Sequence, residues 1–210
     1  MKIVKRHQSS GHNAAIYALQ NGLSRGSFMS AAGDGWIVEW PLHQPDLGRL
    51  VAKADAQLFS LHTLPVEQTI VAGDMNGGVH WLYLDEGRPN RHIAHHQKGV
   101  YCILSRSGFV FTLGGDGILT KWRTERPAAV ESLRLSNQAL RSACWWPESS
   151  LLLIGASDQH IYLVDTDTMQ LVRTFHRHIK AQFSALLLIL RNPVFGSVVG
   201  AMLVCVFGTD

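Results

Sequence analysis

The sequence contains few cysteines, and none of them stands in a closely spaced pair. Its 210 residues include only Cys102, Cys144 and Cys205, and no two of these form a CxxC arrangement. An odd and dispersed set gives no sign of a disulfide framework or of a paired-cysteine zinc site. Cys102 and Cys144 lie in apolar stretches, where cysteine usually acts as a small hydrophobic side chain. This usage fits a protein of a reducing compartment.

Long runs of one charge are also missing. The formal net charge is +3, the basic residues are spread along the chain, and no five of them are consecutive. Binding of nucleic acid through a basic patch is therefore not indicated. Residues 1–13 lack the apolar core of a signal peptide, so we expect the protein in the cytoplasm.

The sequence does contain a repeated turn. Residues 30–40 read SAAGDGWIVEW, in which a small apolar run leads to a turn around Asp34 and then to an alternating segment that ends at Trp40. Asp and Gly favour turns, and the alternation has the period of a strand. The turn recurs at steps of 42, 40, 42 and 42 residues. The turn positions are Asp34, Asn76, Asp116, Asp158 and, in a weaker form, Gly200.

Other residue types keep fixed offsets from these turns. In the first repeat, a histidine precedes the turn aspartate by 22 residues, a serine precedes it by four, and a tryptophan follows it by six. The third repeat keeps three of these positions and has His95 or His96 near the fourth. The second has Asn and Leu in place of Asp and Trp, and the fourth keeps two aspartates. The signature residues are His12, Ser30, Asp34, Trp40, Asn76, Thr112, Asp116, Trp122, Asp158 and Asp165.

With these residues the chain resembles the WD-repeat β-propeller family, whose unit of about 40 to 45 residues forms a four-stranded blade. The resemblance implies a His–Ser/Thr–Asp–Trp hydrogen-bond network in each blade, complete in the first repeat only. It also implies an all-β propeller with four clear blades and a degenerate fifth, and it leaves open whether the ring closes. Because repeats share a continuous core, we expect one domain over residues 1–210. Blade signatures fall near residues 11–40, 54–82, 95–122 and 137–165, and the degenerate blade at 178–207.

Short apolar runs separated by turns predict the individual strands. In the first blade they are residues 16–19, 28–32 and 36–40, with an outer strand at 49–52. Residues 2–5 are expected to add a strand to the last blade, as in the family, since closing the ring pairs edges that would otherwise be exposed.

The C-terminal residues 181–207 depart from the pattern, because their only charged side chain is Arg191. Three interpretations remain open. The first is a degenerate fifth blade. The second is a membrane segment, although a span needs about 20 mostly apolar residues and Arg191 interrupts this run. The third is a shifted reading frame after about Lys180, which translation of the gene's other frames would reveal. The fifth blade would have strands at 183–190, 193–198 and 201–207.

Several side chains are candidates for metal binding or catalysis. His92, His95 and His96 form an H-x-x-H-H cluster, and imidazole is the commonest metal ligand. No cysteine or carboxylate stands within a short local spacing of them, so we interpret the segment as a solvated loop. Aspartates such as Asp34 and Asp116 recur at equivalent turns, which favours turn capping over catalysis, and no G-x-S-x-G elbow is present. We predict no catalytic residue, no metal site and no cofactor.

These features favour a non-catalytic scaffold that binds a protein or peptide. In the family, the loop before each inner strand and the turn carrying the aspartate share one face, which commonly binds partners. That rim would be locally basic here, so we expect an acidic or phosphorylated peptide. Two alternatives remain: a membrane-associated protein tethered by its apolar C-terminal segment, and a truncated propeller without independent function. The candidate rim residues are Asn13, Arg91, His95, His96, Lys98, Asn137 and Gln138.

The number of repeats generates a prediction about association. Propellers have about four to eight blades, and the WD-repeat family most often has seven. An incomplete ring would leave strand edges and apolar blade faces uncovered. We therefore predict that the isolated chain self-associates or is poorly soluble. Size-exclusion chromatography and circular dichroism test this, since a sharp monomer peak with cooperative melting of an all-β protein contradicts it.

Overall fold

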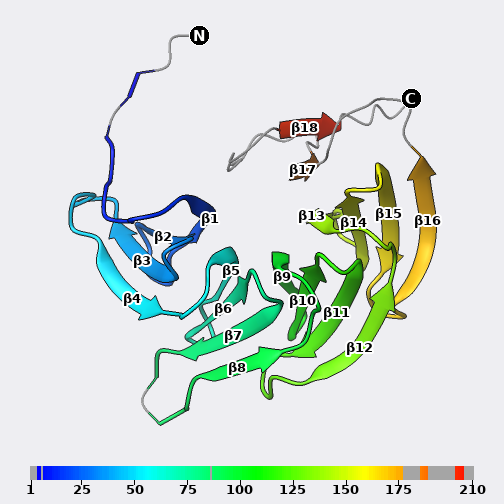
Figure 1. Cartoon of the computed structure of the whole chain (residues 1–210), viewed down its shortest axis with the longest axis horizontal. Coiled ribbons are helices and arrows are strands. Elements are labelled where there is room, and N and C mark those ends of the chain that lie inside the picture. Colours follow the sequence, from blue (N-terminus) through cyan, green and yellow to red (C-terminus); the bar gives the residue numbers. More distant parts are fainter. Residues whose placement is uncertain (1–3, 6, 86, 177–184, 189–201, 206–210) are drawn as a thin grey trace. The chain divides into compact units, whose positions relative to one another are not determined.

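The computed structural model describes residues 4–5, 7–85, 87–176, 185–188 and 202–205 (Figure 1). These residues form strands, turns and loops, with no helix among them. The chain divides into two compact units, Met1–His95 and His96–Asp210. Each unit contains two four-stranded antiparallel sheets whose strands follow one another in chain order. This arrangement confirms the all-β class and the four clear blades.

The first unit contains blades 1 and 2. In both, each strand pairs with the next one along the chain, so the blade is an antiparallel meander. Blade 1 consists of β1 (Ile16–Asn21), β2 (Ser27–Ala32), β3 (Trp36–Pro41) and β4 (Arg49–Lys53). Blade 2 consists of β5 (Leu58–Leu64), β6 (Thr69–Asp74), β7 (Gly78–Tyr83) and β8 (Arg91–Ala94).

The second unit contains blades 3 and 4, built in the same way. Blade 3 consists of β9 (Val100–Arg106), β10 (Phe109–Gly114), β11 (Ile118–Arg123) and β12 (Ala129–Arg134). Blade 4 consists of β13 (Leu140–Trp145), β14 (Leu151–Ala156), β15 (His160–Asp165) and β16 (Gln170–His176).

Burial follows the order of strands in each blade. The second strands are covered on both faces: all six residues of β6 are buried, while the outer strands β4 and β12 are largely exposed. In the first unit, Met29, Leu58 and Ile70 of neighbouring blades share one apolar cluster. Blades that bury continuous apolar runs against each other gain most of their stability from that contact.

The second unit has an equivalent core. Phe111, Leu140 and Leu152 of blades 3 and 4 pack in one cluster, and Cys102 lies against it. Burial raises the pKa of the Cys102 thiol to about 11, so the thiol stays protonated at neutral pH. This agrees with its expected use as a small hydrophobic side chain.

Both ends of the chain differ from the expected strands. Residues 2–3 lie outside the described part, and Val4 and Lys5 are not in a strand. Near the other end, β17 (Ala185–Leu188) and β18 (Met202–Cys205) fall within the expected strands at 183–190 and 201–207. They pair directly and in parallel, however, whereas a degenerate blade would place an antiparallel strand between them. Most of residues 178–207, including the proposed middle strand, lie outside the described residues. Within the described residues, no helix has the length and apolarity needed to cross a membrane.

The turn glycine of blade 1 generates a prediction. Gly35 has a φ of 76°, and a Cβ there would lie 2.2 Å from the carbonyl oxygen of Ala54. Gly26 has a similar φ of 78° but open space around it. Left-handed backbone costs a non-glycine residue roughly 1–2 kcal/mol. We therefore expect Gly35→Ala to lower the free energy of unfolding by more than Gly26→Ala, which bears the backbone cost alone. Urea titrations of both variants measure the difference, and equal losses would contradict the steric account.

Candidate functional site

The four signature residues of blade 1 form one hydrogen-bonded chain. Trp40 Nε1 donates to Ser30 Oγ at 2.8 Å, and Ser30 Oγ lies 2.7 Å from His12 Nε2. His12 Nδ1 lies 3.1 Å from both carboxylate oxygens of Asp34. One proton order satisfies every group: Ser30 donates to Nε2, and Nδ1–H donates to the carboxylate. The network thereby ties the loop before β1 to the turn between β2 and β3.

Blade 3 repeats this chain with threonine in place of serine. Trp122 Nε1 donates to Thr112 Oγ1 at 2.9 Å, Oγ1 lies 2.8 Å from His96 Nε2, and His96 Nδ1 lies 3.2 Å from Asp116. The sequence left open whether His95 or His96 holds this position, and the structure assigns it to His96. Because the His96 side chain is fully buried, it cannot serve as a rim residue, and we remove it from that set.

Blade 4 builds a different network around its turn. Asp158 accepts hydrogen bonds from the hydroxyls of Ser136 at 2.5 Å and Tyr162 at 2.6 Å, and from the amide of His160. Ser136 precedes Asp158 by 22 residues, the same spacing that separates His12 from Asp34 in blade 1. Burial and the hydrogen bond to Asp158 raise the pKa of Tyr162 to about 12. Asp165 accepts from Ser150 Oγ at the other edge of this blade.

The turn aspartates share one electrostatic condition. Burial alone would raise the pKa of Asp116, but the Gln97 amide and His96 outweigh it and hold the pKa below its ordinary value. The pKa of Asp34 is lowered in the same way by the amides of Trp36 and Asn13. Each carboxylate is therefore ionised at neutral pH and accepts hydrogen bonds from both its turn and the loop before the blade.

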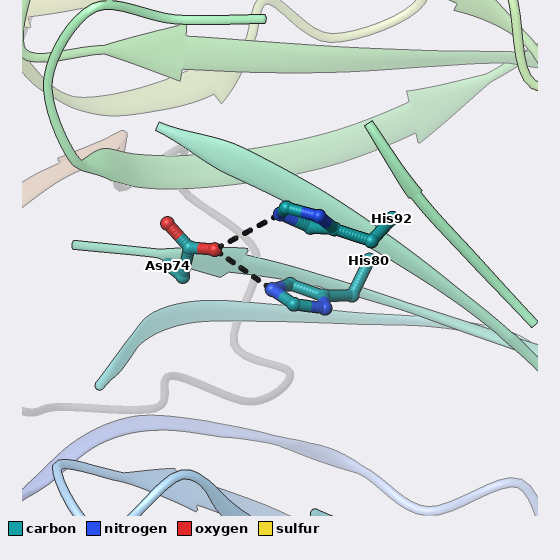
Figure 2. Close-up of side chains that lie close together, drawn as sticks. All are labelled: Asp74, His80 and His92. Atoms are coloured by element: carbon teal, nitrogen blue, oxygen red, sulfur yellow. Dashed lines mark hydrogen bonds and ion pairs between the residues drawn. The ribbon is translucent and has the colours of Figure 1, made fainter. Parts of the chain in front are cut away.

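Blade 2 departs most from the signature, and its departure creates a cluster of possible ligands. Asn76 at the turn position does not act as the acceptor; instead Asp74 Oδ1 accepts from the amides of Asn76 at 2.8 Å and Gly78 at 2.9 Å. Its other oxygen, Oδ2, lies 2.8 Å from His80 Nε2 and 3.5 Å from His92 Nε2. Figure 2 shows the two imidazole rings one above the other, with the carboxylate facing both.

Strand register brings these side chains together. His80 on β7 and His92 on β8 are directly paired across the two strands, so both rings project from one face, with centroids 4.5 Å apart. Asp74 ends β6 beside them. One donor atom from each of the three residues lies within 4.8 Å of the others.

The cluster borders an open cleft of about 470 Å³ inside the first unit. The Asp74 side chain is 3% exposed and that of His80 is 16% exposed, whereas that of His92 is 53% exposed. The cluster is thus fixed on its buried side and accessible from the cleft. Other lining residues include Lys53, Asp55, Leu82, Asn90 and Arg91.

The structure separates the histidines that the sequence grouped. His96 joins the blade 3 network, the backbone amide of His95 donates to the Gly77 carbonyl, and His92 joins His80 and Asp74. Sequence reasoning missed this cluster because it considered only ligands close in sequence to His92, and Asp74 and His80 lie further away along the chain. The alternation of residues 78–83 predicts a strand, and pairing this strand with the next one through a hairpin would have placed His80 opposite His92.

The remaining rim residues also have defined places. Asn13 is exposed, and its amide donates to Asp34; Lys98, Asn137 and Gln138 are exposed in loops that precede β9 and β13. Arg91 lies on β8 opposite Trp81, away from the loop edge, because it begins the strand rather than ending it. It lines the cleft described above.

Comparison with known proteins supports the fold. No protein-family model matches the chain, and no curated protein matches it. The WD40 β-propeller domain of Doa1 aligns with a TM-score of 0.67 and 19% identity, over 79% of this chain and 56% of that chain. The computationally designed Ika4 protein aligns with a TM-score of 0.63 and 19% identity, over 76% of this chain and 98% of that chain. The chain has a WD40-like propeller fold and spans little more than half of the Doa1 domain.

The blade 3 network can be tested at its central hydroxyl. Thr112→Val keeps the shape but removes the oxygen that meets Trp122 and His96, and leaving a buried polar group without its partner costs roughly 1–3 kcal/mol. Thr112→Ser keeps the hydroxyl and loses one methyl, worth about 1 kcal/mol. We expect the valine variant to be the less stable of the two in chemical denaturation. The opposite order would show that packing of the methyl matters more than the hydrogen bonds.

The lowered pKa of Asp116 predicts a dependence of stability on pH. Its folded-state pKa lies below the ordinary 3.8, so its contribution is complete above about pH 4 and declines as the pH falls through the folded value. Asp116→Asn should reduce stability at pH 7 and flatten the loss of stability as the pH falls below about 4. Unfolding free energies at a series of pH values test this, and a parallel pH profile in the variant would contradict it.

Proposed function

We propose that the chain is a WD-repeat protein that acts as a non-catalytic scaffold, with the loops along one edge of its blades as the binding surface for a protein or peptide. The observation that carries this proposal is the fixing of those loops by the turn networks. Loops on a rigid scaffold are the usual place for recognition. The expected cytoplasmic location is part of the same proposal.

In the second unit, hydrogen bonds join successive loops into one edge. The Gln97 amide donates to Asp116, and the Gly115 amide donates to the carbonyl of Gly99. Further along, the Leu135 amide donates to the carbonyl of Gly117. These bonds hold the loop before β9, the β10–β11 turn and the loop before β13 together, so the side chains there are displayed with little freedom.

The charges on this edge favour an anionic ligand. Lys98 and Arg134 are exposed, and the Arg134 guanidinium donates to the Asp116 carbonyl oxygen. Arg141 lies over the Tyr101 ring at 4.1 Å and also donates to Ser157 Oγ. The Asp116 carboxylate, in contrast, is buried within its network. Guanidinium groups held in place bind carboxylate and phosphate groups well, so we propose an acidic or phosphorylated peptide.

Charge reversal tests this proposal. Lys98→Glu should weaken capture of phosphoserine-containing or glutamate-rich peptides on beads by about fivefold or more, since it both removes an attraction and adds a repulsion. Arg126→Glu, on the exposed connection between β11 and β12, makes the same charge change at the other edge of blade 3 and serves as the control. Equal capture by the two variants, or none by the unmodified chain, would contradict the proposal.

A further inference from the structure

We propose that Asp74, His80 and His92 of blade 2 form a binding site for a divalent transition-metal ion, with Zn²⁺ as the representative ion. The three residues offer a carboxylate oxygen and two imidazole nitrogens within 4.8 Å of one another. This proposal concerns strands β6, β7 and β8 of blade 2 and does not depend on the proposed peptide binding.

The carboxylate is oriented in advance of any ligand. Asp74 Oδ1 accepts two backbone amides, from Asn76 and Gly78, and this leaves Oδ2 directed at the two histidines. Outer hydrogen bonds of this kind hold a metal ligand in place and reduce the freedom lost on binding. The rings are set by the pairing of β7 with β8, because His80 and His92 occupy directly opposite positions.

The backbone leaves the space for the donor atoms. A Cβ on Gly78 would lie 2.2 Å from His92 Nε2 and 2.3 Å from Asp74 Oδ2. Only glycine at this position lets the imidazole of His92 approach the carboxylate. The space between Asp74 Oδ2 and His92 Nε2 thus depends on the absence of a side chain at Gly78.

The two distances from the carboxylate oxygen to the imidazole nitrogens are close to those of a tetrahedral site. Ligand atoms about 2.1 Å from a tetrahedral Zn²⁺ are about 3.4 Å from one another. The separation of Asp74 Oδ2 and His92 Nε2 is 3.5 Å, and that of Oδ2 and His80 Nε2 is 2.8 Å. His80 must therefore move outward by a few tenths of an ångström. The ion replaces the proton between His80 and Asp74, and that proton is released or moves to Nδ1.

The donor set selects the class of ion. Two imidazoles and one carboxylate suit Zn²⁺, Cu²⁺, Ni²⁺ or Co²⁺, whereas Ca²⁺ and Mg²⁺ need more oxygen ligands. Lys53 and Arg91 also line the cleft and balance Asp55 and Asp74, so the cleft has no excess of negative charge to attract a hard cation. The cleft gives water access to a fourth coordination position, as in zinc sites with three protein ligands.

Metal titration of the full chain tests the proposal. The chain is stripped with a chelator and titrated with Zn²⁺ by isothermal calorimetry, and separately with Co²⁺ while the visible spectrum is recorded. We expect one saturable Zn²⁺ site and the strong d–d absorption of tetrahedral Co²⁺. His92→Gln should weaken binding by about tenfold or more and abolish that absorption, because one of three protein ligands is lost. His92→Asn is the second variant, and since the side chain is 53% exposed, neither change should disturb the fold by circular dichroism.

Blade 4 supplies a matched control. His160 and His176 are also paired across two strands, with ring centroids 4.7 Å apart, but they do not belong to a three-ligand group among the described residues. His176→Gln should leave the Zn²⁺ affinity and the Co²⁺ spectrum unchanged. The proposal is overturned if the unmodified chain binds no Zn²⁺, or if His92→Gln and His176→Gln bind it equally, which would assign the affinity to scattered histidines.

Discussion

The arrangement of every blade depends on a hydrogen-bonded carboxylate in the turn between its second and third strands or directly before it. Asp34, Asp116 and Asp158 each accept a backbone amide from the residue two positions later, and each also holds the loop that precedes the blade. A carboxylate removed from water is costly unless it is fully hydrogen-bonded. The satisfied acceptor therefore fixes two chain segments at once, and the loops proposed for binding depend on it.

Blade 2 also has a hydrogen-bonded carboxylate beside its turn, but this carboxylate contacts histidines of β7 and β8. Its acceptor is displaced by two residues to Asp74, the last residue of β6, which accepts the amides of Asn76 and Gly78. The partners found in blade 1 are absent: Ala72 stands in place of the serine and Leu82 in place of the tryptophan. The free side of the carboxylate meets His80 and His92 instead. The network of blade 2 thus ends at His92, which is exposed at a cleft, whereas the His12 and His96 side chains of blades 1 and 3 are buried.

The sequence predicted most of the fold, because the turn residues and the strand alternation are local properties. The extents of β2 and β3 follow closely from their apolar runs, and the partners of His12 follow from repeat offsets. The cluster around Asp74 could not be predicted in this way. Its formation depends on the register of β7 with β8, which is set by the connection between them and not by the spacing of its histidines. A strand at residues 2–5 was predicted from its family role, yet Val4 and Lys5 lie outside any strand, because a strand needs a partner edge that local sequence does not specify.

The unequal connections between strands bear on where foreign sequence can be inserted. The turn between the second and third strands occupies three residues in all four blades: 33–35, 75–77, 115–117 and 157–159. At the other edge, the connection between the third and fourth strands varies, occupying residues 42–48, 84–90, 124–128 and 166–169. The length is the same in all four blades where the turn aspartates or Asp74 accept backbone amides, and it varies at the other edge. A peptide tag or a reporter domain inserted in residues 42–48 would therefore lengthen a connection whose length already varies between blades, and the strand pairing within the blade would stay the same.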